Sequence, residues 1–202
     1  MKVIEAIRKR RSQRSYLGKP VKKEAIEQLL ELANLAPTAK SLQNRNFIIV
    51  TDKKIKEKIY EAGFRQKQLR EAPVIIALTT DFNKFEPKAF LQKCRDWGMS
   101  VFGATPENFT DNPNFNQNWR IWTQLWPIQD VDAAITTLML AATNKGLSTC
   151  WIGLFNHKKV EKILKLPENQ RVVSLVCLGY PKGLPKPQER KPIEELIHWQ
   201  KW

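Results

Sequence analysis

Hydrophobic positions along the chain follow helical and strand spacings in turn, and they predict most of the secondary structure. Apolar residues from Ile26 to Ala33 recur at helical spacing, so we expect a helix over 23–35 that ends before Pro37. Further patterns predict buried strands at 47–50, 74–78 and 172–178, and helices at 53–62 and 157–164. Helices interspersed with few strands indicate an α+β fold.

The middle and the end of the chain have distinct compositions. Residues 81–127 are rich in Asn, Phe, Trp and Pro, and we interpret them as an inserted lid or partner-contacting segment with short helices. Asp130 is expected to cap a long helix over about 130–145, whose nearly uncharged sequence places it in a core or at a dimer interface. The tail, 182–202, is expected to carry a short helix at 192–199.

Composition bounds the class of protein. The 202 residues suffice for a single domain, 1–202, with its own core. No apolar run of about 18 residues predicts a transmembrane helix, and no apolar leader follows Met1, so we expect a cytoplasmic protein. Three scattered cysteines and two histidines predict neither a disulfide framework nor a metal site.

The formal net charge of +14 indicates anionic partners or a lysine-rich solvated surface. The lysines lie mostly in mixed-charge helices, and no block of five or more basic residues occurs. A basic nucleic-acid-binding module is therefore an alternative from charge alone. No recognisable nucleic-acid-binding motif supports it, so we expect no nucleic-acid partner.

A run of basic and hydroxyl side chains follows the first amphipathic segment. Arg10, Arg11 and Arg14 place three guanidinium groups around Ser12. Arginine offers several donors in one plane, which matches phosphate oxygens, and serine adds a neutral hydrogen bond. Taken alone, the run fits either a phosphate clamp or a solvated helix end, so its meaning depends on the remaining motifs.

Five motifs occur in order along the chain. They read Ile-Arg-Lys-Arg-Arg-Ser-Gln-Arg-Ser-Tyr at 7–16, Ala-Pro-Thr-Ala-Lys-Ser-Leu-Gln-Asn-Arg-Asn-Phe at 36–47, Lys-Gly-Leu-Ser-Thr-Cys-Trp-Ile-Gly at 145–153, Leu-Gly-Tyr-Pro at 178–181 and Arg-Lys-Pro at 190–192. Together they resemble the nitroreductase family of FMN-dependent oxidoreductases, over essentially the whole chain except 81–127. The resemblance implies an α+β sandwich with a central mixed or antiparallel sheet flanked by helices, in an intertwined homodimer. The C-terminal tail is then expected to contact the partner subunit.

The same resemblance implies the chemistry. FMN lies at the dimer interface, and NADH or NADPH as co-substrate delivers a hydride to flavin N5 in a ping-pong cycle. A small-molecule electron acceptor, which is a nitroaromatic compound, a quinone or free flavin, then takes the electrons. The cofactor carries this chemistry while the protein supplies orientation and electrostatics, so no catalytic side chain is expected.

Cofactor contacts are also implied at the matching positions. The resemblance assigns a clamp on the FMN phosphate and ribityl chain, a loop that the partner subunit lays against the flavin, a polar contact to the pyrimidine edge, and a strand end near N5 and O4. At that strand end a backbone N–H stabilises developing charge, and glycine permits a close approach. The residues are Arg10, Arg11, Ser12, Arg14 and Arg190 for the clamp, Thr38, Ala39 and Ser41 for the loop, Gln68 for the pyrimidine edge, and Ile152, Gly153 and Leu154 for the strand end.

Three positions depart from the family pattern. Ser41 stands where the family usually has Asn, and Asn44-Arg45 replace the usual Pro-Trp. Gly153 occupies a position that is Glu in the bacterial nitroreductases that reduce nitrofurans. A reductive dehalogenase, a flavin-modifying enzyme and a non-catalytic flavin-binding protein share the fold, and all three stay open as functions of this chain.

Overall fold

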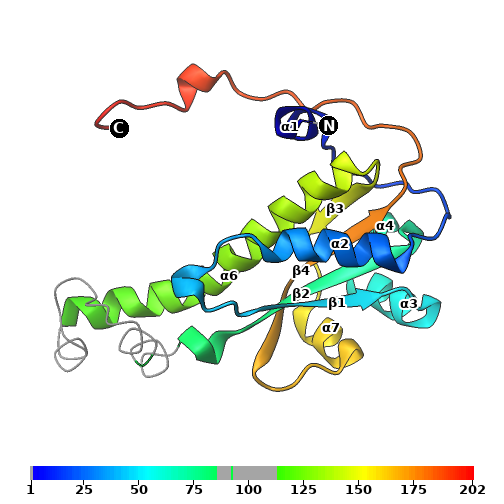
Figure 1. Ribbon diagram of the computed structural model, residues 1–202. Coiled ribbons are helices and arrows are strands. Elements are labelled where there is room, and N and C mark those ends of the chain that lie inside the picture. The colour runs from blue at the N-terminus through cyan, green and yellow to red at the C-terminus, as the bar shows by residue number, and fades with distance from the viewer. Residues whose placement is uncertain (1, 86–91, 93–112) are drawn as a thin grey trace.

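The computed structural model describes residues 2–85, 92 and 113–202 (Figure 1). Most of the expected insert, 81–127, therefore lies outside the described residues. The described strands form one antiparallel sheet in the order β1-β2-β4-β3. Their bounds are β1 Arg45–Val50, β2 Val74–Asp81, β3 Ser148–Ile152 and β4 Gln170–Gly179. The α+β class and the sheet predicted from the sequence are confirmed.

Helices cover both faces of this sheet. The α-helices are α1 Val3–Lys9, α2 Lys23–Asn34, α3 Lys53–Ala62, α4 Lys67–Glu71, α6 Pro113–Asn144 and α7 His157–Leu164, and the short 3-10 helices are η1 Ala39–Ser41, η2 Phe82–Phe85 and η3 Ile193–Glu195. The predicted starts of α3 and α7 follow from their caps, since Asp52 accepts from the Ile55 N–H at 2.9 Å and Asn156 from the Lys159 N–H at 3.0 Å.

Two apolar layers enclose the sheet. In Figure 1, α2 and α6 cross one face while α3 and α7 lie against the other. Leu29 of α2 and Leu138 of α6 are fully buried in the first layer, and Ile59 of α3 and Val160 of α7 in the second. The central strand β2 is buried along its whole length, which explains its unbroken apolar run.

The long helix differs from its prediction. It begins at Pro113 and contains Pro127, so Asp130 lies inside the helix and does not cap it. Proline lacks one backbone N–H, and a helix of 32 residues retains enough other hydrogen bonds to continue through it. The Asp130 carboxylate instead accepts a hydrogen bond from the Ala39 N–H at 2.7 Å.

The tail also differs from its prediction. The expected helix at 192–199 is only the three-residue turn η3. Short helices are stabilised mainly by packing of an apolar face, and here Ile193, Leu196 and Trp199 are all exposed. None of the described helices has the length and apolarity needed to cross a bilayer.

Asp132 of α6 predicts a pH dependence of stability. Its side chain is partly buried, and Oδ1 has no hydrogen-bond partner among the described residues. Burial raises the pKa of this carboxyl above its ordinary value. The native state therefore retains a proton that the unfolded chain has released, so stability falls as pH rises from about 4 through the native pKa.

Asp132→Asn is expected to remove this decline. Urea unfolding at a series of pH values between about 4 and 7 gives the free energy of unfolding of each protein. The value for the variant minus that for wild type should grow with pH. Equal pH dependence in the two proteins would contradict the assignment.

Candidate functional site

The basic run of the N-terminus lies along the edge strand β3. Ser12 forms a parallel bridge with Thr149, and the Gln13 N–H donates to the Thr149 carbonyl at 2.8 Å. Tyr16 then bridges to Pro181, just after β4. These main-chain contacts fix the backbone of the segment on the sheet, so the positions from which its polar side chains extend are also fixed.

Two side chains of this segment are buried in the protein interior and hold it in place. Gln13 is 2% exposed and Tyr16 5% exposed, whereas Ser12 and Arg14 are exposed. The Tyr16 hydroxyl donates to the carbonyls of Gln13 at 2.8 Å and of Cys177 at 3.4 Å. Burial raises the pKa of Tyr16, so its hydroxyl remains a proton donor. Sequence reasoning misses both anchors, because a spacing of three residues fits no strand alternation.

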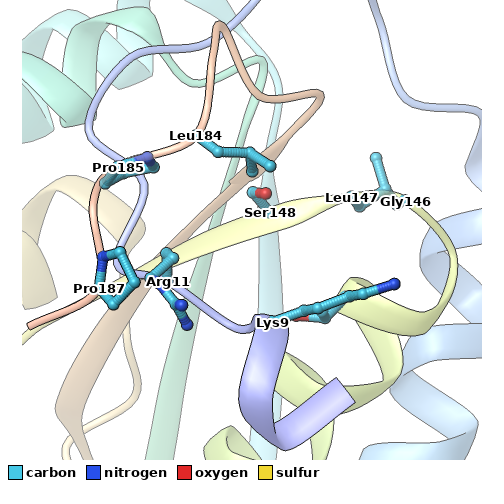
Figure 2. A pocket seen from close by; sticks show the side chains of 9 residues that line it. Lys9, Arg11, Gly146, Leu147, Ser148, Leu184, Pro185 and Pro187 are labelled. Carbon is cyan, nitrogen blue, oxygen red and sulfur yellow. The ribbon is translucent and has the colours of Figure 1, made fainter. Parts of the chain in front are cut away.

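The C-terminal tail passes beside the same run. A cavity of about 400 Å³ lies between them, and Figure 2 shows Lys9 and Arg11 lining it together with Leu184, Pro185 and Pro187 of the tail. Arg190 follows three residues later and is exposed. The structure thus brings the tail to the N-terminal run, while a shared contact of Arg190 with a phosphate stays a prediction.

The guanidinium groups of the run do not all point outward. Arg11 Nη1 donates to the carbonyls of Arg8 at 2.6 Å and Arg10 at 2.8 Å, so its side chain folds back on the end of α1. Arg14 lies close enough to β3 for its charge to oppose the rise in the pKa of Cys150 that burial causes. Among the other members of the run, Ser12 and Arg14 are exposed and Arg10 is half-buried.

The predicted strand end is positioned by the end of β3. Ile152 is buried in the second layer, while Gly153 and Leu154 are exposed. A Cβ added at Gly153 would meet nothing within 4 Å, and its φ lies outside the left-handed region. Neither the backbone conformation nor the packing therefore requires glycine at 153. The open space around it is available to a ligand.

A pair of glutamines connects the predicted pyrimidine contact with this strand end. Gln68 is buried, and its Nε2 donates to Gln66 Oε1 at 3.1 Å. Gln66 Nε2 donates in turn to the Leu154 carbonyl at 2.6 Å. Gln68 therefore reaches the strand end through Gln66, a residue that sequence reasoning misses. The preceding Phe64 and Arg65 have φ of 56° and 57°, the left-handed region that non-glycine residues adopt at a cost.

The predicted loop at 38–41 lies away from the other contacts. Ala39 of the loop is hydrogen-bonded to Asp130 of α6, whereas Lys9 and Arg11 at the run line a cavity with Thr143 of the same helix. The 13 positions from Asp130 to Thr143 span about 20 Å of helix. Lys40 and Ser41 have φ of 49° and 50°, and Gln43 has 48°. Within one chain, the loop and the N-terminal run therefore lie beside parts of α6 that are about 20 Å apart.

The two residues that replace the usual Pro-Trp are both buried and hydrogen-bonded. Asn44 Nδ2 donates to Thr80 Oγ1 at 3.0 Å and to the Asp81 carbonyl at 2.5 Å. The Arg45 guanidinium donates to main-chain carbonyls, those of Asn34, Ala36, Pro37 and Asp130. The departure in sequence is thus accommodated by the fold with its polar groups largely satisfied.

Comparison with known proteins places the chain. The model of the Nitroreductase family matches residues 7–73 and 113–180. A Thermus thermophilus protein named NADH dehydrogenase is 29% identical, over 95% of this chain and 92% of its own, and a Bacillus subtilis protein named FMN reductase (NAD(P)H) is 28% identical, over 97% and 72%. The crystal structure of nitroreductase A from Vibrio parahaemolyticus, 22% identical, covers 100% of this chain and 78% of its own with a TM-score of 0.77 and shares the fold. Sequence motifs, fold and family match agree, and the chain belongs to the nitroreductase family.

Proposed function

We propose that the protein is an FMN-dependent oxidoreductase that uses NADH or NADPH to reduce small-molecule acceptors. The observation that carries the proposal is the placement of the arginine-bearing N-terminal run along β3, the strand that ends just before Gly153. A relative named FMN reductase (NAD(P)H), which this chain matches over 97% of its length, supports the cofactor and the co-substrate. The acceptors that we propose are nitroaromatic compounds, quinones or free flavin.

The residues present fit FMN by their chemistry. A phosphate needs guanidinium and hydroxyl donors, and Arg10, Ser12 and Arg14 supply them from a segment that buried anchors hold in place. A flat ring needs backbone that can be approached closely, and the open space at Gly153 allows this. FMN, when bound, accepts a hydride from the reduced nicotinamide and passes the electrons to the acceptor.

The chain's own groups bind and orient in this proposal. Arg10, Arg14 and Arg190 neutralise the phosphate charge, and the Gly153 backbone N–H donates toward the ring where negative charge develops. The hydrogen bond from Gln66 to the Leu154 carbonyl holds the strand end in position for that contact. No side chain is required as a nucleophile or general acid in this arrangement.

We also propose that the working unit is a homodimer. In one chain the loop at 38–41 and the N-terminal run lie beside parts of α6 about 20 Å apart, and a second copy can bring its loop to the first copy's run. Val3, Ile4 and Leu35 are exposed, and apolar residues of α1, α2 and α6 line a groove of about 510 Å³. Apolar surface of this kind marks protein interfaces. A sedimentation mass of twice the 23.5 kDa chain tests this proposal.

Anaerobic spectroscopy tests the function. The purified protein should be yellow and release FMN on denaturation, and NADH or NADPH should bleach the flavin absorption. Addition of a quinone or a nitroaromatic compound should restore it. A protein that neither retains nor takes up FMN refutes the proposal, and a protein that holds FMN without bleaching is a flavin-binding protein without turnover.

Gly153→Leu is expected to separate cofactor binding from folding. The space around the position is open, so the midpoint of thermal unfolding of the apo-protein should stay within about 2 °C of wild type. The added side chain blocks the approach of the ring, so the dissociation constant for FMN should rise at least about tenfold, a cost of about 1.4 kcal/mol. Fluorescence titration of apo-protein measures the second effect. Unchanged FMN affinity would place the ring elsewhere.

A further inference from the structure

Arg45, the first residue of β1, makes an unusual set of contacts. It is 7% exposed, and its two terminal nitrogens donate to four main-chain carbonyls. Nη2 reaches Asn34 at 2.7 Å and Ala36 at 2.5 Å, and Nη1 reaches Pro37 and Asp130, both at 3.2 Å. One guanidinium thus joins β1, the end of α2, the segment before the loop at 38–41, and α6.

These carbonyls explain why a cation suits the position. The last carbonyls of a helix have no partner within the helix, and the C-terminal end of a helix favours positive charge. Asn34 is the last residue of α2, and Ala36 and Pro37 lead directly into the loop. The planar fork of arginine can reach several acceptors at once, which the single ammonium group of lysine cannot do with the same geometry.

Asp130 provides a second attachment for the same segment. Its Oδ1 accepts from the Ala39 N–H at 2.7 Å, one residue into the loop. The loop is therefore held on α6 twice, once through the Arg45 guanidinium and the Asp130 carbonyl and once through the Asp130 carboxylate. Only the stretch from Lys40 to Gln43 extends beyond both attachments, and it contains the three left-handed residues.

Burial of these two charges is costly. Burial lowers the pKa of Arg45 and raises that of Asp130, and each charge opposes the shift of the other. Arg45 Nε and Asp130 Oδ2 are buried without a hydrogen-bond partner among the described residues. A hydrophobic side chain of similar volume often stabilises a fold as well as a buried ionic group does. Filling the space alone would not require arginine at position 45. The need for directional hydrogen bonds to the segment before the loop does explain it.

We propose that Arg45 is a positioning residue for the cofactor: it holds residues 34–39 against α6 and so places the loop at 38–41 for contact with the flavin bound by the partner subunit. The inference rests on the proposed FMN function and on the proposed dimer. Arg45 stands where the family pattern usually has Trp, and the single N–H of an indole could not make these four hydrogen bonds.

The test measures FMN binding to apo-protein by fluorescence titration. Arg45→Ala should raise the dissociation constant at least about tenfold, and Arg45→Lys should raise it by a smaller factor because one ammonium cannot replace the fork. Arg171→Ala is the matched control, since Arg171 is exposed and also donates to two carbonyls, of Glu168 and Gln170, at the start of β4 and outside the proposed site. Its dissociation constant should equal that of wild type.

Chemical rescue separates positioning from general stability. Methylguanidinium chloride at a non-denaturing concentration should enter the cavity left in Arg45→Ala and restore FMN affinity by several-fold, while sodium chloride at equal ionic strength should not. Hydrogen exchange of the amides at 38–43 should be faster in Arg45→Ala than in wild type and should slow again with methylguanidinium. Exchange in β2 and β4 should remain at the wild-type rate.

The outcomes are distinct. A wild-type protein that binds no FMN refutes the proposed function, and the exchange of 38–43 then still decides whether Arg45 holds the loop. A wild type that binds FMN together with an unchanged affinity in Arg45→Ala overturns the inference. Where Arg45→Ala does not fold, Arg45→Lys decides. Weaker FMN binding at an unchanged unfolding midpoint supports positioning, and unchanged binding overturns it.

Discussion

Replacing Arg10 or Arg190 by alanine is expected to weaken FMN binding by about 1.5–3 kcal/mol in each case, the range for hydrogen bonds to charged groups. A loss of this size raises the dissociation constant about tenfold to more than a hundredfold. The expectation follows from geometry for Arg10, which closes α1 just before the segment that pairs with β3. For Arg190 it follows from the tail, which reaches the N-terminal run at Pro187.

Titration of apo-protein with FMN at several salt concentrations measures both variants. A lost phosphate contact should also weaken the salt dependence of binding, because salt screens exposed charges. Arg10→Lys keeps the charge and should lose less than Arg10→Ala, and the exposed Arg171→Ala should bind as wild type does. If the Arg10 and Arg190 alanine variants both bind FMN with wild-type affinity, the FMN phosphate does not bind at this end of the molecule.

Gly179→Ala is expected to lower the free energy of unfolding by about 1–3 kcal/mol, the cost of overpacking a filled interior. Gly179 ends β4, and an added Cβ would lie 2.5 Å from Pro73 Cδ, 2.7 Å from Pro73 Cγ and 3.0 Å from Tyr16 Cδ1. The proline ring is rigid and cannot move aside. Tyr16 can move aside only by breaking its hydrogen bonds to the carbonyls of Gln13 and Cys177, so the strain reaches the segment that carries Ser12 and Arg14.

Gly18→Ala is the matched control for this substitution. It lies two residues beyond Tyr16, a Cβ there would meet nothing within 4 Å, and its φ is ordinary. Urea unfolding should show wild-type stability for Gly18→Ala and a clear loss for Gly179→Ala, accompanied by weaker FMN binding in the second variant alone. A Gly179→Ala protein as stable as wild type would mean that β4 and Pro73 can separate at no cost.

Sequence patterns predict the elements whose stability is local or whose burial is complete. The runs in β2 and β4 are apolar because both faces of these strands are covered, and α3 and α7 begin at residues that cap them. The predicted start of α6 is wrong because Asp130, although of a type that caps helices, lies inside a helix that begins at Pro113 and continues through Pro127. The predicted tail helix is wrong because helical sequence without a buried face forms only a turn.

The same distinction between local and long-range interactions applies to the candidate site. The arginine run is predictable because its chemistry lies in consecutive residues. The residues that hold it are not, because Tyr16 acts through a carbonyl 161 positions away and Gln66 through one 88 positions away. Arg45 is visible in the sequence only as a departure from a family pattern, and its role depends on carbonyls that α2 and α6 bring together.

The pairing of the N-terminal run with β3 has a consequence for solubility. The outer edge of a terminal strand offers free N–H and C=O groups to other chains, and proteins that leave such edges open tend to aggregate. Ser12 and Gln13 occupy part of that edge of β3. The segment proposed to hold the cofactor therefore also shields the sheet from intermolecular strand pairing. Two requirements therefore constrain the sequence of this segment, namely ligand binding and protection against aggregation.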